Sequence, residues 1–194
     1  MIPIKISLII LSIAFNAQPA FAEKQARYLL GEISLPSKQS PNAFGSYSKG
    51  CLAGGEEMLE SGPTWQVMRL SRDRNWGHPD MITLLKNLSK SVAEKTSWNG
   101  IYIGDISQPR GGPMISGHAS HQLGLDADIW MLPAKNLNLT ELRRESISSI
   151  NIRSKNKKFT NSNWTNEHMD VLKIFAKDPS VDRIFVTAPA KIYM

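Results

Sequence analysis

The sequence predicts an α+β domain, because it combines two amphipathic helical segments with several short strand-like runs. Its 194 residues suit one domain, and 41% of them are hydrophobic, which is enough for a packed core. A third observation concerns chemistry. Two histidines and two aspartates lie close together within residues 118 to 128.

Charge and cysteine content limit the classes of partner and cofactor. The net charge of +6 suits an anionic partner such as a cell-wall polymer, a membrane surface or nucleic acid. Only the net charge supports nucleic-acid binding, and the sequence contains no recognisable nucleic-acid-binding module. We therefore expect no nucleic-acid partner. The single cysteine, Cys51, excludes an internal disulfide and a cysteine-based zinc cluster within the chain.

The first 22 residues have the pattern of a secretory signal peptide. Lys5 precedes an apolar run over residues 6–15, and Ala20-Phe21-Ala22 forms a small-x-small cleavage site. An N-terminal membrane anchor is the alternative, but the apolar run is too short to span a bilayer. We therefore expect a periplasmic protein that begins at Glu23 and keeps no stable membrane anchor after the signal is removed.

The first half of the domain is expected to contain loops, two strands and one helix. Residues 31–65 are rich in Gly, Ser and Pro, which is typical of loops. Residues 66–71 and 100–105 suit short strands. Between them, Pro79 suits the first position of a helix. The helix's apolar stripe follows at helical spacing: Met81, Leu84, Leu85, Leu88 and Val92.

The second half is expected to contain two strands and one helix around a polar excursion. Residues 125–131 alternate in polarity as a strand does. Residues 134–163 are polar and read as a solvated loop. A helix is expected from about Thr165 to Lys177, followed by a last strand over residues 181–187.

The segment from residue 116 to residue 128 has the composition of a metal site. Imidazole and carboxylate are the usual non-thiol ligands of zinc. If residues 125–131 form a strand, His121 in the preceding turn can fold back and meet Asp128 at one metal ion. A surface loop whose polar groups serve turns and caps is the alternative. The density of His, Gly and Asp favours the metal site.

These thirteen residues read Ser-Gly-His-Ala-Ser-His-Gln-Leu-Gly-Leu-Asp-Ala-Asp and resemble the signature of the penicillin-insensitive murein endopeptidases. The resemblance extends from about Cys51 to Val186 through further motifs such as Asn-Trp-Gly-His-Pro at residues 75–79. It implies a zinc peptidase related to lysostaphin, D-alanyl-D-alanine peptidases and Hedgehog domains. The implied fold is a small antiparallel sheet that carries the zinc site, with helices packed on one side. The implied substrate bond is the D-alanyl to meso-diaminopimelyl cross-link of peptidoglycan.

The resemblance also implies the metal ligands. The family's first zinc ligand and its carboxylate ligand, seven residues apart, match His121 and Asp128. His118 matches a further family histidine that has been associated with a second metal site. Asp126 is expected to hydrogen-bond a histidine ligand from outside. Ser120 is discounted as a nucleophile, because a bound Zn²⁺ ion that activates water needs no acyl-enzyme.

One part of the family pattern is absent from this sequence. The family's third zinc ligand and its catalytic histidine come from a later His-x-His motif, whereas only His168 follows Asp128 here. We expect a packing role for His168, at the edge of an apolar helical face, and a structural or capping role for His78. No catalytic residue is therefore assigned. Residues 23–194 are interpreted as an endopeptidase domain that lacks its C-terminal part, with Cys51 left without its partner and little or no activity. The alternative is a module that binds peptidoglycan without cleaving it.

Overall fold

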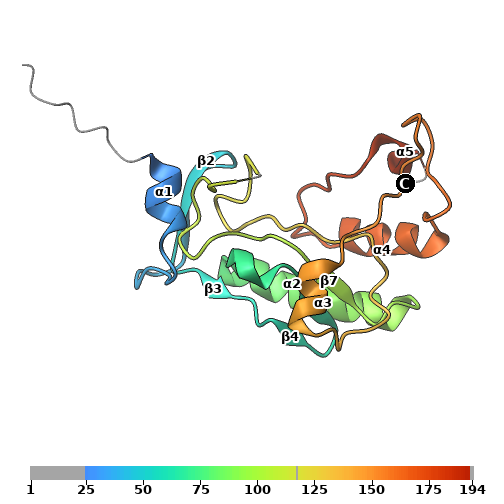
Figure 1. Ribbon diagram of the computed structural model, residues 1–194, viewed down its shortest axis with the longest axis horizontal. Coiled ribbons are helices and arrows are strands. Elements are labelled where there is room, and N and C mark those ends of the chain that lie inside the picture. Colours follow the sequence, from blue (N-terminus) through green and yellow to red (C-terminus); the bar gives the residue numbers. More distant parts are fainter. Residues whose placement is uncertain (1–24, 117, 193–194) are drawn as a thin grey trace, which may run out of the picture.

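A computed structural model of the chain describes residues 25–116 and 118–192. The expected signal peptide over residues 1–22 lies outside these ranges. Among the described residues, no helix has the length and apolar character needed to cross a membrane. Figure 1 shows α1 and β2 at one end of the molecule, α2 in the middle, and α4 and α5 at the other end.

The described residues form short strands and helices of very different length. The strands are β1 (Asn42–Ser46), β2 (Lys49–Ala53), β3 (Glu56–Glu57), β4 (Ser61–Gly62), β5 (Trp65–Val67), β6 (Trp76–Gly77) and β7 (Ile101–Ile103). The helices are α1 (Ala26–Gly31), the 3₁₀ turn η1 (Leu70–Arg72), α2 (Pro79–Lys95), α3 (Glu141–Ser146), α4 (Asn166–Ala176) and α5 (Ala188–Lys191).

The strands pair in three small sheets, which confirms the α+β class. β1 pairs with β2 and β3 pairs with β6, both antiparallel. The third sheet has the order β4-β5-β7, and its β5–β7 pair is parallel. Parallel neighbours need a crossover connection, and α2 lies in the chain between β5 and β7. The expectation of one antiparallel sheet is therefore wrong in part.

Helix α2 begins at Pro79, as predicted, and is the central helix of the fold. His78 is its N-cap, and the side chain of His78 accepts a hydrogen bond from the backbone N–H of Asp80 at 3.3 Å. The expected capping role of His78 is thus confirmed. The helix buries an apolar stripe that consists of Ile82, Leu85, Leu88 and Val92.

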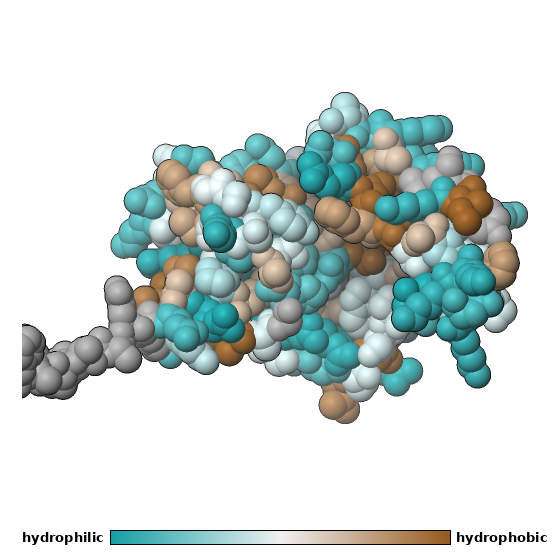
Figure 2. Space-filling view, turned by 90° about the horizontal axis from the view of Figure 1, so that it is seen from above, coloured by the Kyte–Doolittle hydropathy of each residue, from teal (hydrophilic) through white to brown (hydrophobic). Residues whose placement is uncertain are grey.

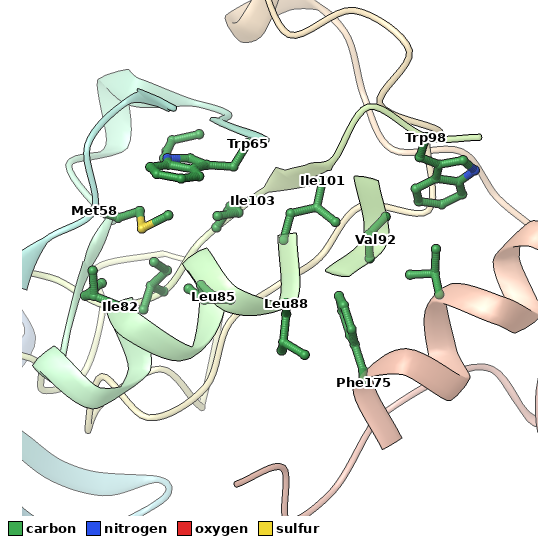
Figure 3. Packing of buried hydrophobic residues seen from close by; sticks show 13 residues of the cluster. Met58, Trp65, Ile82, Leu85, Leu88, Val92, Trp98, Ile101, Ile103 and Phe175 are labelled. Atoms are coloured by element: carbon green, nitrogen blue, oxygen red, sulfur yellow. The ribbon is translucent and has the colours of Figure 1, made fainter. Parts of the chain in front are cut away.

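The main core lies between α2, α4 and the third sheet. Figure 3 shows Leu88 and Val92 of α2 together with Phe175 of α4, which reaches toward α2. On the sheet side, Ile101 and Ile103 of β7 are fully buried in the same cluster. The core therefore fixes the end of β7 relative to α2 and α4.

Helix α4 is confirmed, and His168 has the expected packing role. The side chain of His168 is fully buried. Its Nδ1 lies 2.8 Å from the Thr165 hydroxyl and accepts a hydrogen bond from the Thr165 N–H, while Nε2 lies 2.9 Å from the Met131 carbonyl oxygen. His168 thus caps α4 and ties it to the chain that follows residues 118–128.

Several sequence-based boundaries are wrong. Residues 31–65 contain the β1–β2 hairpin, although β1 is exposed along most of its length and has no alternating pattern. The strand expected at 66–71 is β5, which covers only 65–67 because Arg69 has a left-handed φ of 61° and starts a turn. The polar excursion at 134–163 is mostly irregular, as expected, but it includes α3.

Two expected strands are absent from the described residues. Residues 125–131 form only an isolated antiparallel bridge, between Ile129 and Ile103. Residues 181–187 pair with no described segment, and Phe185 is 72% exposed. A strand forms only where a neighbour satisfies its backbone groups, and polarity alternation does not supply that neighbour. The expected metal ligands therefore lie on a loop that touches β7, and not on a strand of their own.

Candidate metal site

The backbone beyond β7 places Asp128. The N–H of Gly104 donates to the Asp128 carbonyl at 2.7 Å, and the N–H of Asp128 donates to the Asp105 carbonyl at 2.9 Å. The N–H of Trp130 donates to the Tyr102 carbonyl at 3.0 Å. These bonds hold the segment that carries Asp128 beside a strand whose residues are buried in the core.

Two left-handed residues shape the loop that carries His121. His121 has a φ of 63°, which is uncommon for a residue with a side chain, and Gly124 has a φ of 65°. A side chain at Gly124 would approach the backbone N of His78 to 2.9 Å, so only glycine fits. The Gly124 carbonyl accepts a hydrogen bond from that same His78 N–H at 2.9 Å. The start of α2 therefore anchors the loop.

The structure brings together the three side chains that the sequence predicted as ligands. His121 Nε2 lies 3.4 Å from Asp128 Oδ1, and His118 Nε2 lies 3.9 Å from Asp128 Oδ2. One ligand atom from each of the three residues lies within 4.8 Å of the others. The two imidazole rings meet edge to face, with centroids 4.8 Å apart.

Asp126 occupies the outer side of His121. Its Oδ2 lies 2.9 Å from His121 Nδ1 and also accepts a hydrogen bond from the His121 backbone N–H at 3.3 Å. The contact with Nδ1 is an ion pair and not an aligned hydrogen bond, so buried Nδ1 lacks a well-aligned partner among the described residues. The carboxylate therefore faces one ring nitrogen while the other faces Asp128, which is the placement expected for Asp126.

Burial and the two carboxylates act on the pKa of His121 in opposite directions. Burial lowers it, because a charged imidazolium loses hydration, but the interactions of the ring nitrogens with the carboxylates of Asp126 and Asp128 outweigh burial and raise the pKa to about 10. For Asp128, burial raises the pKa, but His121, His118 and Arg72 have the larger combined effect and lower it. Without a metal, the site is thus a histidinium held by carboxylates.

The three side chains fit a zinc ion. Zn²⁺ takes imidazole nitrogen and carboxylate oxygen at about 2.0–2.2 Å in a tetrahedral arrangement, which puts neighbouring ligand atoms about 3.4 Å apart. The separation of 3.4 Å between His121 Nε2 and Asp128 Oδ1 matches that spacing, and one ligand atom of His118 lies within 4.8 Å of the other two. Three protein ligands and one open position are typical of a catalytic zinc site.

A groove of about 580 Å³ opens beside these residues. His118, His121 and Asp128 line it. Apolar side chains of α2 and α4, including Leu88 and Phe175, and the segment around Ile184 line it as well. Figure 2 shows apolar side chains exposed in a hollow on the half of the molecule that holds α4. A peptide with both polar and apolar parts can therefore lie next to the candidate metal site.

The two other histidines do not join the triad, since His78 caps α2 and His168 caps α4.

The sequence did not predict a buried charge cluster beside the His–His–Asp triad. Asp105 is 2% exposed and forms ion pairs with Arg72 and Arg74. In the sequence, the available indication was its position at the end of the expected strand over residues 100–105.

An α+β domain with a His–His–Asp cluster on a loop beside β7, next to a groove, defines the class as a candidate metal-binding protein. The family described as penicillin-insensitive murein endopeptidase matches residues 43–194. The chain belongs to this family.

Relatives of the same name support the assignment. The chain is 36% identical to the penicillin-insensitive murein endopeptidase of Haemophilus influenzae over 159 residues, which covers 82% of the chain and 54% of the relative. It is 35% identical to that of Pectobacterium atrosepticum over 184 residues, covering 94% and 64%. For the relative from Klebsiella pneumoniae the identity is 35% over 161 residues, covering 82% and 58%. The chain thus spans between about half and two thirds of the length of these relatives.

Proposed function

We propose that the protein is a zinc-dependent endopeptidase that hydrolyses the D-alanyl to meso-diaminopimelyl cross-links of peptidoglycan. The observation that carries the proposal is the cluster of His118, His121 and Asp128 at the wall of the groove. The relatives named as murein endopeptidases support the choice of substrate.

Four side chains have two kinds of role in the proposed site. His118, His121 and Asp128 hold the metal, and Asp126 orients His121 through Nδ1 so that Nε2 faces inward. A bound zinc ion supplies an activated water at neutral pH and polarises the scissile carbonyl. The low exposure of His121, 4%, keeps bulk water from that ligand.

We also propose that the protein acts in the periplasm. Residues 1–22 have the pattern of a cleavable signal peptide, and peptidoglycan lies outside the cytoplasmic membrane. The mature chain would begin at Glu23 and carry one positive charge fewer, because only Lys5 is charged among the removed residues. The basic surplus suits a cell-wall polymer with free carboxylates.

Two measurements on the purified chain test the proposal. Calorimetry should show zinc binding that Asp128→Asn abolishes and that Asp170→Asn, an exposed change on α4, leaves unchanged. Purified sacculi should then be digested in zinc buffer and the muropeptides separated. Release of monomers from cross-linked dimers by the unaltered chain, but not by Asp128→Asn, supports the proposal and would contradict the expectation of little or no activity that was drawn from the sequence.

Each outcome against the proposal has its own meaning. Zinc affinity that is equal in the two variants would remove the metal assignment. Zinc binding and co-sedimentation with sacculi, without any release of muropeptides, would favour a peptidoglycan-binding module in its place.

A further inference from the structure

We propose that Gln122 is a positioning residue that joins the loop of the metal ligands to the β1–β2 hairpin and so fixes two parts of the groove relative to each other. The inference rests on the proposed function, because His118 and His121 are taken there as metal ligands. Gln122 follows His121 directly in the chain, and it is only 4% exposed. A buried amide side chain at this place must find hydrogen-bond partners, and they show what it holds together.

On one side, the amide of Gln122 binds the end of the β1–β2 hairpin. Its Oε1 accepts a hydrogen bond from the Gly50 N–H at 3.1 Å, and its Nε2 donates to the Ser48 carbonyl oxygen at 2.9 Å. The two segments approach each other so closely that a side chain at Gly50 would overlap Leu123. The hairpin end and the ligand loop are therefore in direct contact at Gln122.

On the other side, the same amide closes the turn that contains His121. Nε2 also donates to the Ala119 carbonyl oxygen at 3.1 Å, and the backbone carbonyl of Gln122 accepts from the Gly112 N–H at 3.0 Å. His121 lies inside this turn with a left-handed φ of 63°. A residue with a side chain keeps such a conformation only where its surroundings impose it. Gln122 thus supplies contacts that hold His121 in the orientation that faces Asp128.

The hairpin turn that Gln122 holds also carries a residue of the groove. Tyr47 directly precedes Ser48 and lines the same groove as His121. Its side chain is 49% exposed, and its ring centroid lies 6.2 Å from that of Phe185, which lines the groove as well. Because one amide binds both segments, a change at Gln122 should alter the ligand loop and the position of Tyr47 together.

Gln66 provides a matched control, because it joins two segments in the same way elsewhere in the fold. It is 2% exposed. Its Oε1 accepts from the Leu139 N–H at 3.1 Å, and its Nε2 donates to the Leu139 carbonyl at 3.1 Å and to the Ser61 hydroxyl at 3.3 Å. These partners lie outside the ligand loop and the β1–β2 hairpin. Loss of the Gln66 amide should therefore weaken the fold without changing a contact of Gln122.

A comparison of Gln122→Met with Gln66→Met separates positioning from general support of the fold. Met has nearly the shape of Gln but lacks its N–H donors and its carbonyl acceptor. Both variants should unfold at a lower urea concentration than the unaltered chain. In calorimetry, only Gln122→Met should lower the zinc affinity, by about 5–30-fold, which corresponds to the loss of one or two hydrogen bonds that hold the ligand loop.

The position of Tyr47 supplies a readout that a loss of stability alone does not change. In protein labelled with fluorotyrosine, the fluorine NMR resonance of Tyr47 is assigned through Tyr47→Phe. In the metal-free protein this resonance should shift in Gln122→Met, because Ser48, the next residue, has lost its hydrogen bond to Nε2. It should stay in place in Gln66→Met.

A second variant keeps the test decisive. If Gln122→Met does not fold, Gln122→Asn decides, because its amide is one methylene too short to reach the hairpin and Ala119 together, and the same two changes are expected. An unchanged zinc affinity, a Tyr47 resonance that stays in place, or an equal loss of zinc affinity in Gln66→Met would overturn the inference. Failure of the unaltered chain to bind zinc would instead overturn the proposed function, and the Tyr47 resonance of the metal-free protein would still test Gln122.

Discussion

Zinc binding by this protein is expected to depend steeply on pH, because the metal must displace a proton from His121. The pKa of His121 is raised to about 10, since the attraction of Asp126 and Asp128 outweighs its burial. At neutral pH the metal-free ring is therefore an imidazolium, whereas a metal ligand must be neutral. Binding should release one proton from this residue.

The size of the effect follows from the position of that pKa. As long as the pH stays below about 10, each unit of increase should raise the apparent zinc affinity about tenfold, or about 1.4 kcal/mol. A histidine with an ordinary pKa near 6.5 would instead give an affinity that levels off above about pH 7. The range from about pH 6.5 to 8 thus separates the two cases.

Calorimetry in two buffers of different ionisation enthalpy measures the released protons directly, and a pH series measures the slope. Asp126→Asn removes one of the two carboxylates that raise the pKa of His121, so its affinity should level off at a lower pH. An affinity that does not change between about pH 7 and 8, or binding without proton release, would refute the reasoning.

Three further predictions concern stability and processing. Burial lowers the pKa of His168 in the folded protein below the value of 6.5 in the unfolded chain. The folded protein should therefore have its full stability above pH 6.5 and lose stability as the pH falls from 6.5 through the pKa of the folded state. In urea unfolding, His168→Gln should not show this loss of stability at acidic pH. Leu85→Ala, at a site that is 1% exposed, should lower the free energy of unfolding by about 2–5 kcal/mol, while Leu142→Ala, at 81% exposure, should change it by less than about 0.5 kcal/mol. N-terminal sequencing of the exported protein should begin at Glu23, and a retained Met1 in a membrane fraction would contradict the signal peptide.

Local chemistry was sufficient to predict the two longest helices, α2 and α4, and the candidate ligand residues. Pro79 after a capping histidine, followed by an apolar stripe, specifies α2 because capping and amphipathic spacing act within a few turns of one helix. His121 and Asp128 were predicted from their residue types, from a turn before an expected strand and from the family resemblance, and the structure places them 3.4 Å apart. Both features depend on residues that are close in the chain.

Strand pairing and the buried charges were decided by tertiary structure alone. The segment at 181–187 has the composition of a strand but no described partner, while exposed β1 became a strand because β2 pairs with it. Asp105 meets Arg72 and His118 only because β7, η1 and the ligand loop converge at one end of the core. Such contacts join residues far apart in sequence, and their partners cannot be read from local pattern, because the packing of the whole chain selects them.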